Sequence, residues 1–419
     1  MNILSCFIIA SLSLFALERG VELVPEAPWT MVHRLNDLQE QHGERFVSNA
    51  INSCRHIWSL RDRGLGLSKS ELFELVVFIE TTMPQHISQG RFYMRKELTG
   101  LARTIEYDPE TERVFIHLKT HGIDPVGRGR YKHVTCSIMY SSLSSQLVAN
   151  CILHEHLTDR VLQAVARESF ALRVLSGASG VAETYAICRH EKKRGGKQVV
   201  SFIQRLYRGG TLKKYIAAHS PTTPTLVSLM RDYVHALEEM HAKNILHNDL
   251  HTGNLLVSHN GISTSGVLID FGHAMHVLQA KNRLPKIQAT YRRNPPEVYV
   301  EPNDQINLKA TDLYALGISF YDLYFQEPAS WALKEKFAKE RMQLILENEN
   351  ARREFHAKLL QDLQTALEHK RQAYAEDPCA GIIIQMCDPN PKKRGSARHI
   401  RKKLDRLLST FTKGTTSCE

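Results

Sequence analysis

Two short segments near the middle of the chain carry its most constraining pattern. The first, Leu246–Val257, reads LHNDLHTGNLLV, and the second, Val267–Gly272, reads VLIDFG. Together they supply the carboxylates of Asp249 and Asp270 and the amide of Asn254, which are hard oxygen ligands of the kind that Mg²⁺ prefers. Because Asn254 follows Asp249 by five residues and the second segment comes a short hairpin later, we expect the three side chains to lie close together.

In order and spacing, these segments resemble the catalytic and metal-binding loops of the eukaryotic-type protein kinase superfamily. Asp312, in the run TDLYALG, resembles the helical Asp that buttresses the catalytic loop. Glu297, in PPE, resembles the Glu of the APE motif, and Arg394 resembles its buried ion-pair partner. Thr290 lies seven residues before Glu297, where serine/threonine kinases place the Thr that bonds the catalytic Asp. The resemblance covers about residues 126–407.

The resemblance implies an α+β fold of the bilobal protein-kinase type, with a small five-stranded N-lobe that contains one helix and a larger helical C-lobe. The residue patterns agree, because strand signals begin at Arg103 and surround one helical stretch at about Thr158–Leu175. From Thr211 onward the pattern is mainly helical. We expect this division in chain order: an apolar segment 1–17, a helical extension 18–100, an N-lobe 101–207, a C-lobe 208–411 and a polar tail 412–419.

The resemblance also implies roles in a cleft that binds ATP and Mg²⁺. Asp249 would orient a hydroxyl of a protein substrate, while Asn254 and Asp270 would hold Mg²⁺. The adenine would lie against a hinge at Gln204–Tyr207, and the phosphates would lie under the glycine-rich loop GRGRYKHV. The residues expected to line the nucleotide are Gly127, Gly129, Lys132, Val134, Ala149, Gln204 and Leu206.

The lysine that protein kinases place on the α- and β-phosphates is missing from its usual strand. The chain reads VANC there, so Cys151 occupies the lysine position. In the glycine-rich loop, Lys132 stands in place of the third glycine. This pairing resembles the with-no-lysine kinases, which carry Lys in the loop and Cys on the strand. We therefore expect Lys132 to reach the phosphates, with Glu168 of the predicted helix as its carboxylate partner; a solvent-facing lysine is the alternative.

The activation segment lacks both halves of a phosphorylation switch. The arginine that usually precedes the catalytic Asp, and that binds a phosphate on this segment, is Asn248 here. Between Gly272 and Ala289 the chain contains no Ser, Thr or Tyr. The sequence therefore predicts an enzyme that is active without phosphorylation of its activation loop.

His251 replaces the lysine that serine/threonine kinases carry two residues after the catalytic Asp. A lysine would neutralise the γ-phosphate, whereas an imidazole is charged only below its reference pKa of about 6.5. Two interpretations stay open: turnover is slow or unusually dependent on pH, or the ring only shapes the loop.

Composition and the N-terminus limit the partners and the compartment. The net charge of +10 suits an acidic partner, but no dense basic run with interleaved aromatic residues indicates nucleic-acid binding. Eight scattered cysteines without a CxxC pair indicate a reducing cytosol. Ile3–Leu17 is apolar and uninterrupted, so secretion or membrane attachment through it stays open beside a buried helix. Residues 20–100 could pack on the rest of the chain or bind partner proteins.

Three functions are compatible with these patterns. A protein serine/threonine kinase explains the most residues. A pseudokinase scaffold is favoured by the departures at Cys151, Asn248 and His251, although the three oxygen-bearing side chains of the opening segments are intact. A small-molecule phosphotransferase is the third, because HNDLHTGN also resembles the H-x-D-x-x-x-x-N of aminoglycoside and choline kinases. The resemblance at Glu297 and Asp312 counts against this last alternative.

Overall fold

The structure is a computed structural model that divides into two compact units, Met1–Ile152 and Leu153–Glu419. It describes Glu40 and residues 102–108, 113–118, 127–128, 132–141, 144–153, 159–191, 198–207, 209–259, 262–281, 293–299, 306–329 and 348–414. The apolar segment 1–17 and nearly all of the predicted extension 18–100 lie outside the described residues, as do Gly129 and Thr290. The predicted lobe boundaries stay predictions.

The first unit is a sheet of antiparallel strands. Its described strands are β1 (Ala102–Asp108), β2 (Arg113–Leu118), β3 (Gly127–Arg128), β4 (Lys132–Ser141) and β5 (Ser144–Leu153). They lie in the order β1-β2-β4-β5, with β3 paired to β4. Phe115 and His117, two residues apart on β2, are both buried, as alternation along a strand requires when one face is covered.

The expected number of N-lobe strands is wrong. Two further strands, β6 (Thr184–Glu191) and β7 (Gln198–Arg205), form an antiparallel hairpin in the second unit. The described residues between Ala102 and Arg205 therefore form seven strands rather than five. The excess arises because β1 and β2 form a complete hairpin before the glycine-rich loop, and β2 pairs with β4 through its backbone.

In the second unit, one helix precedes the β6–β7 hairpin. This helix, α5 (Asp159–Val174), matches the predicted helical stretch. Val161, Val165 and Leu172 are buried along it at helical spacing, so an apolar stripe holds the helix against its neighbours. Glu168 also lies on this buried side and is only 3% exposed.

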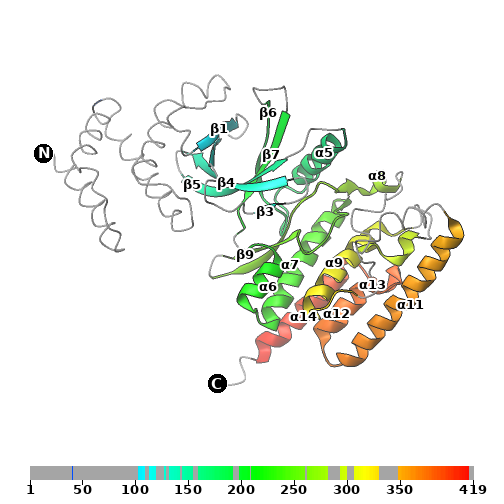
Figure 1. Cartoon of the computed structure of the whole chain (residues 1–419). Helices are drawn as coiled ribbons and strands as arrows, with labels where there is room; N and C mark the ends of the chain where they lie inside the picture. Colours follow the sequence, from blue (N-terminus) through cyan, green and yellow to red (C-terminus); the bar gives the residue numbers. More distant parts are fainter. Residues whose placement is uncertain are drawn as a thin grey trace. The chain divides into compact units, whose positions relative to one another are not determined.

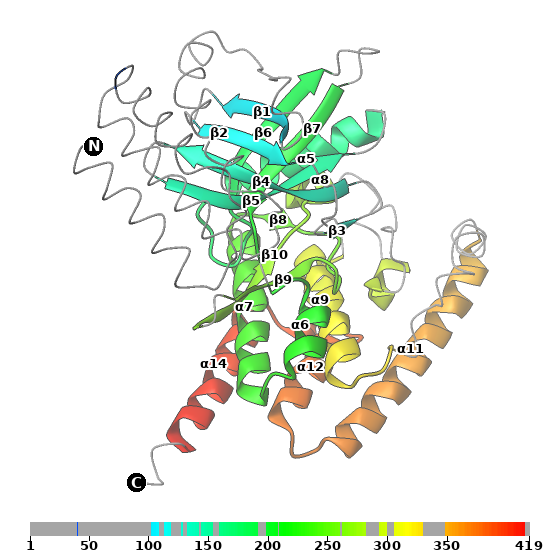
Figure 2. The ribbon, with the colours of Figure 1, turned by 60° about the vertical axis from the view of Figure 1, so that its left-hand side comes forward.

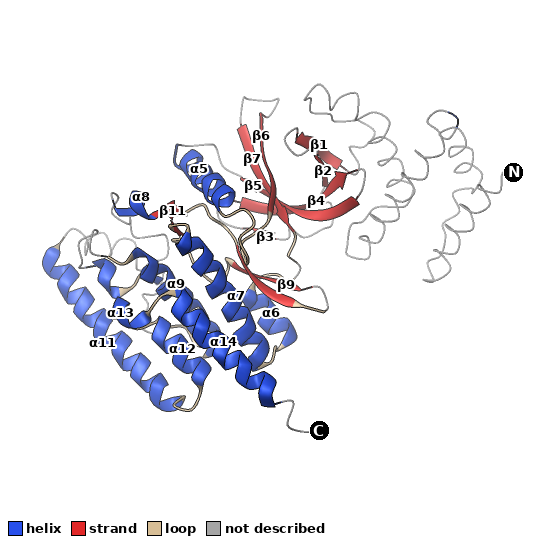
Figure 3. Cartoon of the chain, turned by 180° about the vertical axis from the view of Figure 1, so that it is seen from behind, coloured by secondary structure: helices blue, strands red, loops and turns tan. Residues whose placement is uncertain are grey.

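The remainder of the second unit is mainly helical, as the sequence predicts (Figures 1 and 3). Its helices are α6 (Leu212–His219), α7 (Thr223–Ala242), α8 (Val277–Lys281), the 3-10 helix η4 (Pro296–Tyr299), α9 (Leu308–Tyr324), α11 (Glu349–Ala373), α12 (Pro378–Met386), α13 (Pro391–Arg394) and α14 (Ala397–Gly414). Four short strands, β8 (Ile245–Leu246), β9 (Leu255–His259), β10 (Thr264–Leu268) and β11 (Met275–His276), form two antiparallel pairs, β9–β10 and β8–β11.

Helix α9 lies at the centre of these helices. It is apolar on nearly all sides and packs against α7, α12 and α13 (Figure 2). Such a helix is buried because it has no polar face to present to water. Buried within it, Asp312 is therefore an exception that requires polar partners. No helix among the described residues is both long and apolar enough to cross a membrane.

Candidate active site

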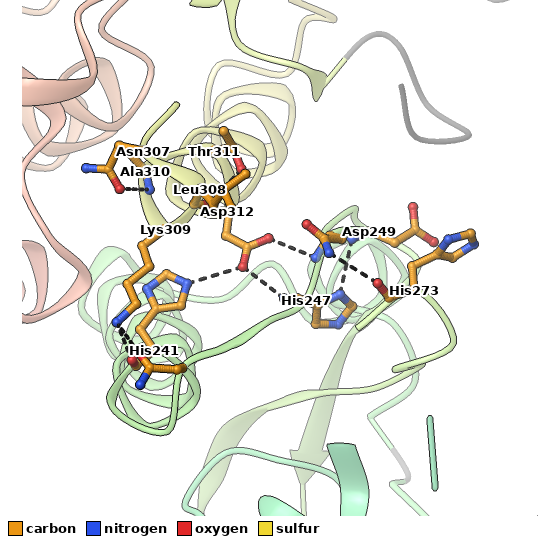
Figure 4. A network of polar contacts seen from close by, with 12 residues as sticks. His241, His247, Asp249, His273, Asn307, Leu308, Lys309, Ala310, Thr311 and Asp312 are labelled. Carbon is orange, nitrogen blue, oxygen red and sulfur yellow. Dashed lines mark hydrogen bonds and ion pairs between the residues drawn. The ribbon is translucent and has the colours of Figure 1, made fainter. Parts of the chain in front are cut away.

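The loop after β8 is held by hydrogen bonds to Asp312 of α9. One carboxylate oxygen of Asp312 accepts the backbone N–H of Asn248 at 2.9 Å, and the other accepts the backbone N–H of His247 at 2.9 Å (Figure 4). The ring of His241, at the end of α7, lies 3.2 Å from the same carboxylate. Asp312 is 2% exposed, so these charge-assisted bonds satisfy a buried carboxylate. The expectation that Asp312 buttresses this loop is confirmed.

The loop is closed by bonds between its own residues. The side-chain amide of Asn254 donates to the backbone carbonyl of Asp249 at 2.8 Å. The backbone N–H of Asn254 donates to the carbonyl of His251 at 2.8 Å. Because its amide nitrogen is committed to Asp249, the buried Asn254 presents its amide oxygen as the remaining acceptor.

The second segment is joined directly to this loop. The backbone N–H of Ile269 donates to the carbonyl of Asn254 at 3.1 Å, which places Asp270 next to the loop. The His247 ring receives the Asp249 N–H at Nδ1 (3.3 Å), so Nε2 carries the proton and donates to the Ile269 carbonyl at 3.1 Å. Asp270 has a φ of +64°, a conformation that is uncommon for residues other than glycine and clusters at functional sites. The structure thus brings together the three side chains that the sequence singled out.

A buried ion pair holds the segment that follows the activation loop. Nη1 and Nη2 of Arg394 donate to the two carboxylate oxygens of Glu297, at 2.6 and 2.8 Å. Arg394 is fully buried and also lies over the ring of Tyr314. The predicted pairing of Glu297 with Arg394 is confirmed. The two residues are 97 positions apart in the sequence, so this ion pair joins η4 to α13.

The protein kinase domain family matches residues 121–404, which is more than half of the chain. The chain belongs to the protein kinase domain family. Its strand-containing N-lobe and helical C-lobe fit the bilobal kinase fold, so the expected fold class is confirmed.

Curated relatives are serine/threonine kinases of modest identity. The chain is 32% identical over 123 residues to the probable serine/threonine-protein kinase zyg-1 of Caenorhabditis briggsae, covering 29% of this chain and 17% of that protein. It is 24% identical over 207 residues to the Aurora kinase of Saccharomyces cerevisiae, covering 48% and 52%. It is 25% identical over 168 residues to the serine/threonine-protein kinase pak-2 of Caenorhabditis elegans, covering 40% and 30%. The matches thus span about half or less of each of these relatives.

Within this kinase domain, Asn254 and Asp270 fit a magnesium-bound nucleotide. Both present hard oxygens, and the orientation of the Asn254 amide leaves its oxygen as the acceptor. Among the described residues, no group of three or more His, Cys, Asp or Glu side chains could enclose a metal ion.

Helix α5 of the kinase domain reaches the Asp270–Gly272 turn. Arg167 donates from Nε to the carbonyl of Gly272 at 3.1 Å. A Cβ atom added to Gly272 would lie 3.5 Å from a carboxylate oxygen of Asp270 and 3.8 Å from one of Glu168. Two carboxylates thus lie near this glycine, and a nearby cation would stabilise the negatively charged form of both.

The nucleotide-lining candidates of the first unit lie on neighbouring strands. Gly127 of β3 pairs with Val134 of β4, and Lys132 begins β4 as a partly buried residue. Ala149 is buried on β5, and Cys151 follows it as a partly buried residue. The pairing of Lys132 with Glu168, and with it the likeness to the with-no-lysine kinases, stays a prediction.

The predicted hinge follows β7. Gln204 is buried and donates its side-chain amide to the hydroxyl of Thr184 at 3.2 Å, so this side chain ties the β6–β7 hairpin together. The hydroxyl of Tyr207 accepts the backbone N–H of Glu183 at 2.9 Å, and burial raises the pKa of Tyr207 to about 12. Leu206 lies between them and is partly buried. Their contact with adenine stays a prediction.

His251 lies next to the carboxylate of Asp249 as a neutral ring. Its Nδ1 accepts the backbone N–H of Gly253 at 3.0 Å, and its Nε2 lies 3.8 Å from a carboxylate oxygen of Asp249. Burial lowers the pKa of His251 from its ordinary 6.5, and the negative charge of Asp249 opposes this only in part. At neutral pH the ring therefore offers Asp249 one N–H group and no positive charge.

The first residues of the activation segment are held by contacts that the sequence did not reveal. The side-chain amide of Asn248 donates to the carbonyl of His273 at 3.2 Å. Farther along, β11 pairs with β8, and the backbone N–H of Val277 donates to the carbonyl of Asn244 at 2.9 Å. The only sequence signal was the substitution of Asn248 for arginine, which pointed to a lost contact and not to this new one.

Proposed function

We propose that this protein is an ATP- and Mg²⁺-dependent protein kinase that transfers the γ-phosphate to serine or threonine hydroxyls. The observation that carries the proposal is the linked set of Asp249, Asn254 and Asp270, held by Asp312 and the backbone bonds described above. The curated relatives are named as serine/threonine kinases, which supports the choice of substrate hydroxyl.

Each residue of the site would have a separate role in the transfer. The bound magnesium–nucleotide supplies the phosphoryl group and offsets its charge. Asn254 and Asp270 would hold the ion through their oxygens. Asp249 would orient the substrate hydroxyl and accept its proton, which requires a carboxylate within hydrogen-bond reach of that hydroxyl. The bond from the Asn254 amide to the Asp249 carbonyl keeps these two functions at a fixed separation.

We also propose that activity does not require phosphorylation of the activation loop. An arginine before the catalytic Asp would need a phosphate to order the segment, whereas Asn248 already bonds the neutral His273 carbonyl. The β8–β11 pairing and the Arg167–Gly272 bond hold the same stretch. These contacts would give without a phosphate the order that other kinases obtain with one.

A pseudokinase scaffold is the second candidate, because Cys151 occupies the position of the usual phosphate-binding lysine. It predicts nucleotide binding that is weak or absent, and no transfer. Under this alternative, the intact Asp249 and Asp270 would be structural, and substitution of either would leave every activity measurement unchanged.

Transfer of labelled γ-phosphate from ATP tests these alternatives. We expect autophosphorylation, and phosphorylation of an acidic protein substrate, that disappear on chelation of Mg²⁺. Asp249→Asn should lower the rate about 10²- to 10⁴-fold, the usual worth of proton transfer by a positioned side chain, and Lys132→Met should abolish it. Asp362→Asn, which alters an exposed carboxylate on α11, is the matched control and should leave the rate unchanged.

Three results would count against the proposal. No incorporation by the wild-type protein would favour the scaffold. Incorporation that is equal in Asp249→Asn would point to a contaminating kinase. Transfer to small alcohols but not to protein would favour a small-molecule phosphotransferase. Incorporation by protein that mass spectrometry shows to be unmodified at Thr290 supports independence from activation-loop phosphorylation; a requirement for phosphorylated Thr290 would overturn it.

A further inference from the structure

The loop that carries Asp270 is anchored on its N-terminal side by the turn that follows α5. Leu268 comes two residues before Asp270 and is fully buried. Its backbone N–H donates to the carbonyl of Gly180 at 2.8 Å, and its carbonyl accepts the N–H of Ala182 at 3.0 Å. Both bonds join backbone groups, so this anchor does not depend on the chemistry of any side chain.

On the C-terminal side of Asp270, a side chain of α5 holds the same loop. Arg167 donates from Nε to the carbonyl of Gly272, two residues after Asp270, at 3.1 Å. Donor and acceptor are 105 positions apart in the sequence, so the bond joins segments that local chain geometry does not bring together. Because the acceptor is a backbone carbonyl, the bond orients the peptide group that ends the Asp270–Gly272 turn.

The backbone between these two anchors has a conformation that requires support. Asp270 has a φ of +64°, which persists only where the surrounding structure determines it. The next residue, Phe271, is fully buried, and its ring centroid lies 5.1 Å from that of His247. A Cβ atom added to Gly272 would lie 3.5 Å from a carboxylate oxygen of Asp270. The carboxylate therefore lies next to the residue whose carbonyl Arg167 holds.

We infer that Arg167 is a positioning residue, whose bond to the Gly272 carbonyl holds the Asp270 carboxylate in the orientation in which it binds magnesium. The inference rests on the proposed kinase function, in which Asp270 is a ligand of the nucleotide-bound ion. Arg167 acts on the ion through Gly272 and Asp270. Substitution of a residue that orients a metal ligand in this way typically lowers metal affinity or activity about 10- to 100-fold.

Arg173 provides a matched control on the same helix. Its Nε donates to the carbonyl of Ser169, four residues earlier, at 3.3 Å. It therefore makes the same kind of bond as Arg167, but within α5. Arg167→Met and Arg173→Met each remove such a bond, and only the first removes one to the loop that carries Asp270.

The first measurement is metal binding. Binding of Mn²⁺, a paramagnetic substitute for Mg²⁺, is followed by electron paramagnetic resonance in the presence of a non-hydrolysable ATP analogue. Arg167→Met should raise the Kd of Mn²⁺ about tenfold or more. Arg173→Met should leave this Kd within about twofold of the wild-type value. Arg167→Lys should lie between the wild-type protein and Arg167→Met, because an ammonium group can donate to the same carbonyl.

The second measurement is amide hydrogen exchange in the protein without metal or nucleotide. In Arg167→Met, exchange should accelerate in Ile269–Ala274 and stay unchanged in α9, because the loop loses one of its two anchors. In Arg173→Met, exchange in Ile269–Ala274 should equal that of the wild-type protein. If Arg167→Met does not fold, Arg167→Ala replaces it in both measurements, since alanine removes the same donor and favours the helix.

Weaker Mn²⁺ binding and faster exchange in Arg167→Met, with neither change in Arg173→Met, support the inference. Either change without the other overturns it, because metal affinity and loop position would then be independent. An equal loss in Arg173→Met also overturns it and points to a general weakening of α5. A wild-type protein that binds no Mn²⁺ with the nucleotide overturns the inference and the assignment of Asp270 as a ligand. A wild-type protein that binds Mn²⁺ but transfers no phosphate overturns the kinase proposal alone.

Discussion

The loop that carries Asp249 and the first part of the activation segment are held by different kinds of contact. The buried carboxylate of Asp312 accepts two backbone N–H groups of this loop, and nearby in the chain's helical part Arg394 pairs with Glu297. At the activation segment, the neutral amide of Asn248 donates to the carbonyl of His273. Buried charges must be fully paired and are costly to disturb, whereas a neutral bond adds order at small cost. Buried charges thus hold the loop that carries Asp249, whereas a neutral bond helps to hold the segment that we propose needs no phosphate.

The largest expected effect is on the buried ion pair. Arg394→Met should lower the free energy of unfolding by about 3–5 kcal/mol, because it leaves the Glu297 carboxylate buried without its partner. Urea-induced unfolding measures the change. The double variant Glu297→Met/Arg394→Met should lose less than the single variant, since no lone charge remains. A single variant that is destabilised no more than the double variant would contradict the role given to charge.

A smaller loss of stability is expected when Asp312, which holds the loop that carries Asp249, is substituted. Asp312→Asn replaces one of the two accepting oxygens with an NH2 group and leaves one of the two backbone N–H groups without an acceptor, which should cost about 1–3 kcal/mol, the usual penalty for an unsatisfied buried donor. Activity should fall with stability, because the same N–H groups belong to the loop that carries Asp249. The exposed Asp362→Asn should change unfolding by less than about 0.5 kcal/mol. Full activity in folded Asp312→Asn would separate the buttress from catalysis.

The hydrogen bond from Asn248 to the His273 carbonyl should affect local order more than global stability. Asn248→Asp removes the donor to the His273 carbonyl while keeping a residue type that tolerates a φ of +60°, and should cost about 1 kcal/mol. Amide hydrogen exchange should accelerate in Met275–Lys281 and stay unchanged in α9. Asn348→Asp makes the same substitution at the N-cap of α11, where a carboxylate still accepts the bond from Ala351, and should have no effect. Equal exchange in Met275–Lys281 for both variants would show that the Asn248 bond does not order the segment.

The smallest effect is a dependence of stability on pH. The pKa of His251 is lower in the folded protein than its ordinary 6.5, so the unfolded chain binds more protons below that pH. The contribution is therefore complete above pH 6.5 and is lost as the pH falls from there through the lower pKa of the folded state. His251→Gln should reduce this loss, which unfolding titrations above and below pH 6.5 would measure. An unchanged pH profile in the variant would mean that the ring titrates as it does in water.

The sequence alone predicted the polar side chains of the site better than it predicted the distant residues that hold them in place. Asp249, Asn254 and Asp270 lie within two short segments, so local chain geometry nearly suffices to bring them together. Asp312 and Arg394 were assigned from family resemblance, because no local pattern indicates a partner 64 or 97 residues away. The expected strand count was too low because the β1–β2 hairpin, which lies within the predicted N-lobe 101–207, adds two strands to the sheet through the pairing of β2 with β4.

By itself, the sequence determined which functional groups this protein offers for the proposed phosphoryl transfer and which it lacks, since residue identity and short spacing need no tertiary context. Only the tertiary structure decided how those groups are held and charged. The bond from Asn248 to the His273 carbonyl and the acceptor state of His251 at Gly253 depend on the direction of individual N–H and C=O groups. The backbone direction at Asn248 is set when the distant helix α9 packs against the loop, because the Asp312 carboxylate then accepts the Asn248 N–H and stabilises a conformation with a φ of +60°.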